Sequence, residues 1–386
     1  MTKVYCLNNI SKTGLEVLDD TFTISDTPEG ADVILVRSAV MHDMEFDPEL
    51  KAIARAGAGV NNIPLDRCAE KGIVVFNTPG ANANAVKELV IAGMMMAARD
   101  IIGGIDWVKE NHNDRNISKD MEKAKKNFAG TEISGKKLGV IGLGAIGTEV
   151  ANACVKLGMT VYGFDPYISV KSAWMLSRSV HHASSADEIF RECDYITLHV
   201  PAMDATKGMI GREAIEKMKD GVVILNYARD VLVNDDDMKE ALESGKVSHY
   251  LTDFPNPAVM SMKNVIATPH LGASTEEAEE NCARMACEQA ADYIRYGNIR
   301  NSVNYPNCDM GVCAYACRLC ILHRNIPNMI GQITAALAAD NMNIANMSNG
   351  SRKEYAYTMI DLENDVPEDM LEKIGRINGV LKVRKL

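Results

Sequence analysis

The chain has 386 residues, of which 47% are hydrophobic and 24% are charged, as in an ordinary globular protein. This length predicts two or three domains, each large enough to bury its own core. The formal charge of -11 is not offset by any strongly basic tract, so the composition argues against nucleic acid as a partner.

No contact with a membrane is expected either. The longest apolar run, Leu89 to Ala98, is about half as long as a membrane-spanning helix, and charged residues lie close by. The N-terminal residues predict a strand and not a secretory leader. Ten cysteines in a chain without such a leader suggest reduced thiols, so we expect a cytoplasmic protein.

Strand and helix signals alternate over most of the chain. The first candidate strands are KVYCLNN, ADVILVRSA and GIVVFNTPG, which are short, β-branched and closed by turn residues. Helical patterns cover Leu50 to Ala56 and Ala83 to Arg99. Six more candidate strands follow at regular spacing, namely KKLGVIGLGAIG, MTVYGFDP, DYITLHVP, GVVILNYAR, SHYLTDF and NVIATPH. This alternation predicts an α/β fold with doubly wound parallel sheets covered by helices.

The C-terminal part has a different pattern. The segment from Ser302 to Met310 is polar and turn-prone, so we expect a linker there. Beyond it the order is strand, helix, two strands, helix and strand, which predicts a small α+β unit of βαββαβ topology.

The stretch from Leu138 to Asp165 combines an apolar strand, a glycine-rich turn and an amphipathic helix. Gly142 permits the tight turn, Gly144 lets the backbone approach a pyrophosphate, and Gly147 lets the helix pack closely on the strand. The phosphate would lie at the helix N-terminus, which favours negative charge. A glycine-rich turn without a ligand is the alternative, but its place between strand and helix favours a dinucleotide site.

Asp165 ends the next strand, where an acid can bind both hydroxyls of a ribose. Its carboxylate would repel a 2′-phosphate, and no arginine follows it in PYIS. The sequence therefore predicts NAD as the cofactor and not NADP.

Polar side chains follow three later strands of the same series. Arg229 follows VVILNYA, Asp253 follows SHYLT, and His270 follows NVIATP. Since ligands of doubly wound sheets bind beyond the carboxyl ends of the strands, we expect these groups in one crevice. A guanidinium can clamp a carboxylate, and an imidazole on a short turn suits proton transfer. A surface arginine and a histidine that only stabilises a turn are the simpler alternatives.

Five segments together resemble the D-2-hydroxyacid dehydrogenase family in order and spacing: VIGLGAIG, LHVP, NYARDVLVN, YLTDFP and ATPHLGAST. The resemblance covers essentially the whole chain. It implies that Arg229 binds the substrate carboxylate and that His270 exchanges a proton with the C2 hydroxyl while a hydride passes to the nicotinamide. Further cofactor contacts implied by the resemblance are Ala145, Ile146, His199, Val200, Pro201, Thr206, Tyr227, Ala228, Asp253, His270 and Gly272.

The resemblance also implies a domain organisation, because helix Thr275 to Tyr296 would return the chain to the first domain. The expected domains are a substrate-binding domain at 1–90 and 272–302, an NAD-binding Rossmann domain at 91–271, and a small domain at 309–386.

The chain departs from the family at the partner of the histidine. The family carries a glutamate in a D-V-F-x-x-E-P type loop, whereas residues 254–269 contain no acid. Asp253 matches the aspartate that usually holds the nicotinamide carboxamide. We hypothesise that it also orients His270, directly or through the cofactor. A second departure is Asp230, where glycine is common, and we expect no catalytic role for it.

Three segments of the first domain, VRSA, RAGAGVNN and NTPGANANAVKE, match substrate-binding segments of the family. Glycines at 57 and 59 would let backbone N–H groups approach a carboxylate. Arg37 and Arg55 are candidates to meet a phosphate. The full set of substrate-binding candidates is Arg37, Ser38, Arg55, Ala58, Gly59, Asn77, Asn82, Lys87 and Arg229. The asparagines would contact the substrate or only stabilise the turn.

The C-terminal unit resembles an ACT domain, a regulatory module that binds amino acids at paired interfaces. HRNIPNMIG and NMNIANM carry the likeness, with Asn328 in place of a glycine. The resemblance implies an L-serine effector held by Asn325 and Asn343, and we expect an assembly of two or four copies. A dimerisation module without an effector is the alternative. Appended to a dehydrogenase of this family, an ACT unit implies a phosphorylated 2-hydroxy acid as the substrate.

Two other functions stay open. One is a reductase of hydroxypyruvate, glyoxylate or another unphosphorylated 2-oxo acid. The other is a nonenzymatic NAD-sensing regulator, because corepressor proteins share this fold. A metal site is not expected at Cys308, Cys313, Cys317 and Cys320, since Cys317 and Cys320 would face opposite sides of a strand.

Overall fold

The computed structural model describes residues 1–386, which form two compact units. Unit 1 contains Met1–Ala81 and Glu279–Leu386, and unit 2 contains Asn82–Ala278. The expected domain boundaries at residues 90 and 272 stay a prediction, and the C-terminal residues group with unit 1. None of the helices is both long enough and apolar enough to span a membrane.

Unit 1 is built on a parallel sheet with the strand order β2-β1-β3-β4-β5. The strands are β1 (Thr2–Cys6), β2 (Phe22–Ser25), β3 (Val33–Val36), β4 (Ala52–Arg55) and β5 (Val74–Phe76). Its helices are α1 (Lys12–Leu15), α2 (Leu65–Glu70) and the long α12 (Glu276–Tyr296), whose first three residues belong to unit 2. This order places the topological switch point between β1 and β3, where sheets of this type bind ligands.

The helix expected over Leu50 to Ala56 is wrong, because those residues contain strand β4. This strand pairs with β3 on one side and β5 on the other. Ala52, Ile53 and Ala54 are fully buried. A short apolar run that is buried on both faces has no alternation, so its pattern does not distinguish a strand from a helix.

Unit 2 contains a seven-stranded sheet of order β12-β11-β10-β9-β6-β7-β8. The six expected strands are confirmed as β6 (Lys137–Ile141), β7 (Thr160–Phe164), β9 (Tyr195–Leu198), β10 (Val222–Asn226), β11 (Val247–Thr252) and β12 (Val265–Ala267). An additional short edge strand, β8, covers His181–His182. All pairings in this sheet are parallel, as the alternating pattern predicts.

Helices cover both faces of this sheet, with a hydrophobic core on each side. They are α3 (Ala83–Ala98), α6 (Ala145–Lys156), α7 (Val170–Met175), α8 (Ala186–Glu192), α9 (Arg212–Lys217), α10 (Asp235–Ser244) and α11 (Pro257–Met260), with short 3-10 turns η1 (Lys125–Asn127) and η2 (Asp230–Leu232). The expected helix from Ala83 is therefore confirmed.

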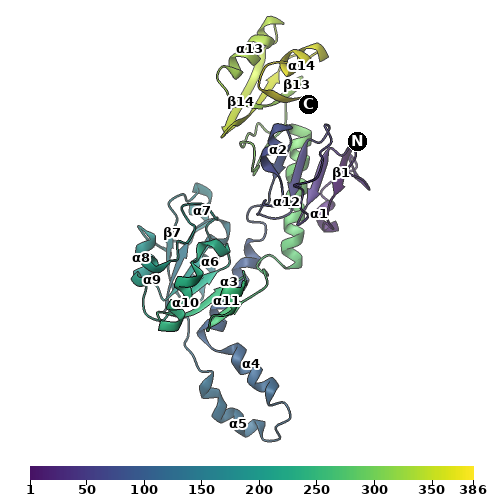
Figure 1. Cartoon of the computed structure of the whole chain (residues 1–386). Coiled ribbons are helices and arrows are strands. Elements are labelled where there is room, and N and C mark those ends of the chain that lie inside the picture. Colours follow the sequence, from purple (N-terminus) through teal and green to yellow (C-terminus); the bar gives the residue numbers. More distant parts are fainter. The chain divides into compact units, whose positions relative to one another are not determined.

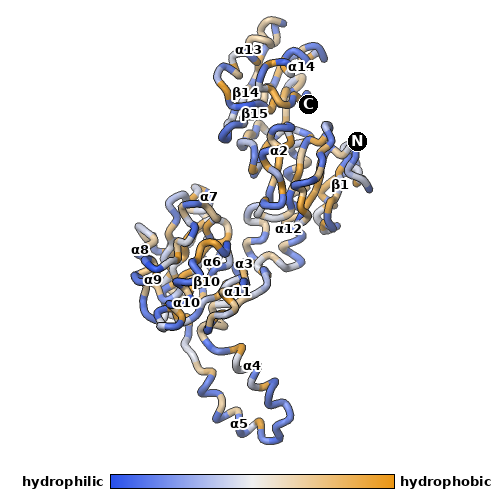
Figure 2. Tube along the Cα trace, viewed as in Figure 1, coloured by the Kyte–Doolittle hydropathy of each residue, from blue (hydrophilic) through white to orange (hydrophobic).

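Two further helices of unit 2 form a hairpin that extends away from the sheet: α4 (Ile101–Glu110) and α5 (Ile117–Ala124) (Figure 1). Neither helix has a fully buried residue. Apolar residues recur along α4, as Figure 2 shows, and four of them are at least 38% exposed, namely Ile101, Ile102, Ile105 and Val108. The hairpin thus leaves an apolar helix face uncovered within one chain.

Residues 317–386 form the C-terminal module, which has the expected βαββαβ order. Its elements are β13 (Cys317–Arg324), α13 (Met329–Ala339), β14 (Ile344–Arg352), β15 (Tyr355–Leu362), α14 (Glu368–Gly375) and β16 (Val380–Lys385). The strands pair antiparallel in the order β14-β15-β13-β16. Asn328 has the left-handed backbone that its place in the motif suggested, with φ of 64°.

The module shares one hydrophobic core with the parallel sheet of unit 1. This core joins Val33 and Phe76 of the sheet, Tyr293 of α12, and Leu322 and Tyr357 of the module. Cys320 lies in it, whereas Cys317 lies in the separate core between the module's own sheet and helices, so the two cysteines face opposite sides as predicted.

The segment Ser302 to Met310, expected as a linker, contains no helix or strand, but much of it is buried. Asn304 accepts a hydrogen bond from the N–H of Val75 at 2.9 Å and donates one to the carbonyl of Ile73 at 2.8 Å. A polar side chain of this segment therefore forms hydrogen bonds with the backbone at the edge strand β5 instead of with water. The composition of the segment could not reveal this.

Two arginines of the module reach the C-terminal end of α12. Arg318 is fully buried in a two-point ion pair with Asp361, at 2.5 and 2.9 Å, and also donates to the carbonyl of Tyr296 at 2.8 Å. Arg384 donates to the carbonyl of Ile294 at 2.9 Å. Since the last carbonyls of a helix lack partners within the helix and carry its negative end, these cations cap α12.

Candidate functional site

The glycine-rich turn follows β6 and leads into α6, at the switch point between β6 and β9. A Cβ atom at Gly147 would lie 1.8 Å from the carbonyl oxygen of Gly142, and one at Gly142 would lie 2.5 Å from the carbonyl oxygen of His199. These two glycines are therefore required by close packing. A Cβ at Gly144 would meet nothing within 4 Å, so this position faces open space beside the N-terminus of α6. That arrangement fits a bound pyrophosphate.

Asp165 directly follows β7 at the same edge of the sheet. Its carboxylate accepts hydrogen bonds from the backbone N–H groups of Leu143 and Tyr167, both at 2.8 Å. The bond to Leu143 ties the acid to the glycine-rich turn. Each carboxylate oxygen retains a lone pair for a ribose hydroxyl.

His199 follows β9, on the other side of the switch point. Its Nε2 lies 3.0 Å from the hydroxyl of Thr197, while its buried Nδ1 has no partner within the chain. Burial lowers the pKa of His199 to about 3, so the ring is neutral at physiological pH. A buried polar atom without a partner beside an open glycine turn fits a dinucleotide that supplies the missing contact.

The three expected catalytic residues follow three adjacent strands. Strand β11 lies between β10 and β12, and Thr252 at its end pairs with Asn226 of β10 and Ala267 of β12. Arg229, Asp253 and His270 come after these strand ends. Because neighbouring strands are about 4.8 Å apart, the sheet brings the three residues to one short stretch of its carboxyl edge.

Asp253 is 1% exposed and holds the turn that carries His270. Its carboxylate accepts hydrogen bonds from the hydroxyl of Thr268 at 2.5 Å and from the N–H groups of Leu271 and Gly272, both at 2.7 Å. The carbonyl of Asp253 accepts from the N–H of His270 at 3.1 Å. Asp253 therefore positions the histidine through the backbone, and no ion pair joins a carboxylate to the His270 ring.

His270 has a φ of 57°, in the left-handed region, which is costly for a residue with a Cβ. The bonds from Asp253 hold this conformation, and the ring is exposed. It packs edge-on against Phe254, with 5.1 Å between ring centroids. An exposed imidazole on a strained, well-fixed turn is suited to proton transfer with a ligand.

Arg229 is exposed, and no carboxylate of the chain pairs with it. Its guanidinium donates only to the carbonyl of Ala228, at 2.6 Å. Asn226 fixes the surrounding turn, donating to the carbonyl of Arg229 at 2.7 Å and accepting from its N–H at 3.3 Å. A cation presented in this way is free to meet an anionic ligand.

In unit 1, residues 37–39 lie at the switch point between β1 and β3. The carboxamide oxygen of Asn8, which follows β1, accepts hydrogen bonds from the N–H groups of Arg37, Ser38 and Ala39, at 2.9, 3.2 and 3.1 Å. One side chain thus fixes the turn that carries Arg37. Sequence reasoning missed Asn8, although its place just after a candidate strand was a usable signal.

The neighbouring loop, at residues 55–59, is fixed in a similar way. The N–H of Gly57 donates to the hydroxyl of Thr78 at 2.7 Å, and the amide of Asn77 donates to the carbonyl of Ala58 at 2.6 Å. Arg55 donates to the carbonyl of Arg37 at 3.1 Å, and a Cβ at Gly57 would lie 2.4 Å from the Arg55 guanidinium. Asn77 therefore stabilises the loop, and Arg37 and Arg55 lie together.

Other expected residues are placed elsewhere or serve the fold. Asn82 and Lys87 belong to unit 2, where Lys87 donates to Asn84. The Thr206 hydroxyl donates to the carbonyl of Pro201 at 2.6 Å and so closes its own loop. Tyr227 is buried, and burial raises the pKa of its hydroxyl.

The two asparagines expected to hold an effector lie at opposite ends of the module's sheet. Asn325 follows the end of β13, whereas Asn343 precedes the start of β14, and β13 and β14 both pair antiparallel with β15. The register spans eight residues, roughly 25 Å of strand. The two amides of one chain therefore do not meet at one ligand.

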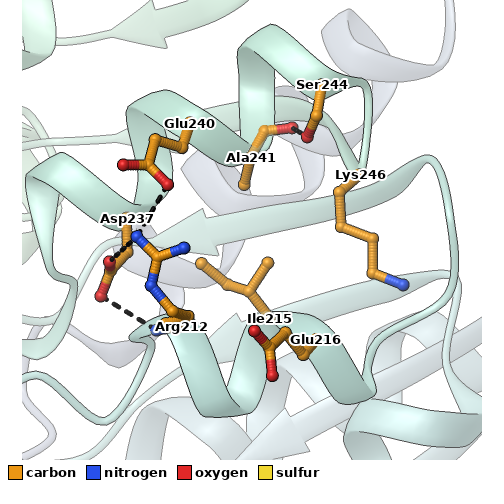
Figure 3. Close-up of a pocket in the computed structure, with 8 residues that line it drawn as sticks. All are labelled: Arg212, Ile215, Glu216, Asp237, Glu240, Ala241, Ser244 and Lys246. Atoms are coloured by element: carbon orange, nitrogen blue, oxygen red, sulfur yellow. Dashed lines mark hydrogen bonds and ion pairs between the residues drawn. The ribbon is translucent and has the colours of Figure 1, made fainter.

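A pocket on the surface of unit 2 lies between α9 and α10 (Figure 3). Arg212 at its rim pairs with Glu240 at 2.7 Å and with Asp237 at 3.3 Å, so its cation is already neutralised. None of the expected site residues lines this pocket.

The chain belongs to the family of D-isomer specific 2-hydroxyacid dehydrogenases. The model of the NAD-binding domain of that family matches residues 91–272, so this part of unit 2 is an NAD-binding domain. The match includes the glycine-rich turn and all three strand ends described above.

Relatives extend over more of the chain. A D-3-phosphoglycerate dehydrogenase of Haemophilus influenzae is 30% identical, over 89% of this chain and 83% of its own length. A hydroxypyruvate reductase of Thermotoga maritima is 41% identical, over 64% of this chain and 80% of its own. The crystal structure of NAD+-bound 3-phosphoglycerate dehydrogenase of Entamoeba histolytica has a TM-score of 0.60 at 26% identity, covering 78% of this chain and 98% of that one.

The chain spans about half the length of some other curated relatives that it matches. One of them, a D-3-phosphoglycerate dehydrogenase of Methanocaldococcus jannaschii, is 40% identical over 72% of this chain but over only 52% of its own length.

Proposed function

We propose that the chain is an NAD-dependent dehydrogenase that oxidises D-3-phosphoglycerate at C2 to 3-phosphohydroxypyruvate, the first step of L-serine synthesis. The observation that carries this proposal is the convergence of Arg229, Asp253 and His270 on adjacent strand ends of the NAD-binding domain. The Haemophilus relative supports the substrate, because its similarity covers 89% of the chain and so extends into the C-terminal module.

NAD, when bound, accepts the hydride that leaves C2. Neutral His270 takes the hydroxyl proton as the C2–O bond becomes a carbonyl, and Arg229 binds the substrate carboxylate and polarises the neighbouring oxygen. Asp253 keeps the His270 turn in place. In the reverse direction the imidazolium returns the proton to the forming alkoxide. In unit 1, Arg37 and Arg55 would supply cations, and Ala58 and Gly59 would supply N–H groups, for the rest of the substrate.

The cofactor contacts expected from the family remain part of this proposal. The glycines and the N-terminus of α6 hold the pyrophosphate, Asp165 binds the ribose, and His199 with Val200 and Pro201 lines the site. Binding of NAD by Asp165→Asn tests the ribose contact, because a loss of preference over NADP is expected when the negative charge is removed.

Reduction of an unphosphorylated 2-oxo acid is the second candidate, and the identity with the hydroxypyruvate reductase favours it. The similarity to that relative covers only 64% of this chain. The similarity to the Haemophilus relative, which supports the first candidate, extends into the C-terminal module. No observation favours the third function, a nonenzymatic NAD-sensing regulator.

Assembly and regulation also belong to the proposal. The uncovered apolar face of α4 supports association of at least two copies, because monomers rarely leave such a face in water. An L-serine effector would need Asn325 of one copy and Asn343 of another, since one chain holds them at opposite ends of a sheet. The proposed assembly is a homodimer or homotetramer.

The test is NADH oxidation with 3-phosphohydroxypyruvate against unphosphorylated hydroxypyruvate, with and without L-serine. A clear preference for the phosphorylated acid is expected. His270→Gln is expected to lower kcat by about a hundred- to ten-thousandfold while NADH still binds. Preference for the unphosphorylated acid would refute the assignment, and binding of NADH without turnover of any 2-oxo acid would favour the regulator.

A further inference from the structure

Arg37 is expected to meet a phosphate, yet the structure gives it a carboxylate partner within the chain. We propose that Glu279 is a specificity-tuning residue, which occupies the Arg37 guanidinium when no substrate is present and is exchanged for a phosphate oxygen when a phosphorylated substrate binds. This inference rests on the proposed function, because it deepens the account of the substrate site.

The position of Arg37 is the first observation. It follows β3 at the switch point of the unit 1 sheet, where its turn is fixed by three hydrogen bonds to Asn8. Arg55 lies beside it, donating to its carbonyl. Two guanidinium groups at the carboxyl edge of a parallel sheet form an anion site by their chemistry.

Glu279 is the second observation. It lies on α12, and its carboxylate accepts a hydrogen bond from one terminal nitrogen of Arg37 at 2.5 Å. Both side chains are 42% exposed, so water can reach the pair and the contact can break without burying a charge. This differs from the Arg318–Asp361 pair of the same unit, whose side chains are 0% and 4% exposed.

The exchange follows from charge. A carboxylate carries one negative charge, whereas a phosphate monoester carries close to two near neutral pH, so the phosphate competes effectively for the cation. While Glu279 stays near Arg37, its own charge repels the incoming phosphate. An unphosphorylated substrate has no group to take part in this exchange. Glu279 should therefore weaken binding of phosphorylated ligands specifically.

The experiment compares Glu279→Gln with Glu280→Gln. Both changes remove one negative charge from the same helix turn, but the Glu280 carboxylate accepts a hydrogen bond from the hydroxyl of Thr13 at 3.0 Å instead of contacting an arginine. Because exposed ion pairs are weak, E279Q is expected to lower KM for 3-phosphohydroxypyruvate by about three- to fivefold, with little change in KM for hydroxypyruvate. E280Q should change neither value by more than about twofold.

Inorganic phosphate serves as a probe that does not depend on turnover. Calorimetric titration of the full chain with phosphate should show tighter binding to E279Q than to the unsubstituted protein, by the same factor. A higher KM for the phosphorylated acid in E279Q would overturn the inference, since Glu279 would then orient Arg37. Equal effects of E279Q and E280Q would also overturn it, because the effect would then come from the long-range charge of the helix and not from the contact with Arg37.

The two proposals can fail separately. If the enzyme prefers unphosphorylated acids, the phosphoglycerate assignment fails, and tighter phosphate binding by E279Q still supports the exchange. If 3-phosphohydroxypyruvate is reduced but E279Q changes neither its KM nor the affinity for inorganic phosphate, the exchange is wrong and the assignment stands.

Discussion

The carboxyl edge of the unit 2 sheet and the contact between the C-terminal module and α12 are held by different kinds of interaction. At the sheet edge, short backbone segments are fixed by glycines and by Asp253, a residue 15 positions from Thr268 and 18 from Leu271. At the module contact, Arg318 meets Asp361, 43 positions away, in a fully buried ion pair. The first region is encoded locally in motifs, whereas the second depends on residues that only the tertiary fold brings together.

The largest expected effect is the loss of the buried ion pair. Asp361→Asn leaves the buried Arg318 guanidinium with backbone carbonyls but without its counter-charge, so the free energy of unfolding should fall by about 3–5 kcal/mol. Denaturant unfolding of unit 1, followed by tyrosine fluorescence, measures it. The control is Glu372→Gln, which removes the exposed pair with Arg376 and should cost less than about 1 kcal/mol. Similar effects of both changes would show that the buried ion pair stabilises the fold no more than an exposed one.

Next come the two glycines of the turn. Gly147→Ala places a methyl group 1.8 Å from a carbonyl oxygen, so the helix must shift, at a cost of about 1–3 kcal/mol. Gly144→Ala meets no atom, and its stability should change by less than about 1 kcal/mol while NADH binding weakens. Thermal unfolding and NADH titration of both variants separate packing from ligand contact. Equal destabilisation of the two variants would show that the two glycines do not have separate roles in packing and in ligand contact.

Asp253→Asn tests how the hydrogen bonds of Asp253 hold the turn that carries His270. The amide can accept fewer of the three hydrogen bonds, so one N–H of the turn loses its acceptor, which costs about 1–3 kcal/mol. The turn should loosen and kcat should fall with an altered pH profile. Asp230→Asn, which makes the same charge change near the site, is the control. If D253N leaves both the rate and the pH profile unchanged, the positioning role of Asp253 is wrong.

The smallest effect concerns His199. Burial lowers its pKa from 6.5 to about 3, so the unfolded chain binds a proton below pH 6.5 that the folded chain does not, and stability falls as the pH drops. Between pH 7.5 and 5.5 this difference amounts to about 1 kcal/mol. His199→Gln should show a correspondingly smaller loss of stability over that range, measured by denaturant unfolding. An identical pH dependence would mean that the ring is not buried as described.

Much of the fold could be predicted from the sequence, because strands, turns and the βαββαβ order depend on local patterns. The glycine-rich turn and the three strand ends were predicted for the same reason. Strand β4 was not predicted, since an apolar run that is buried on both faces shows no alternation of apolar and polar residues. The roles of Asn8, Glu279 and Asn304 were missed because each depends on partners that are distant in the sequence, and a polar residue in a loop gives no sign of what it bonds.

The part of helix α12 that belongs to unit 1 makes charged contacts at both of its ends. Glu279 near its start meets Arg37, and the carbonyls at its finish are held by Arg318 and Arg384. A rigid rod of about 1.5 Å per residue transmits a displacement along its axis with little loss. Exchange of partners at Arg37 and displacement of the C-terminal module should consequently be energetically coupled, because α12 carries contacts to both.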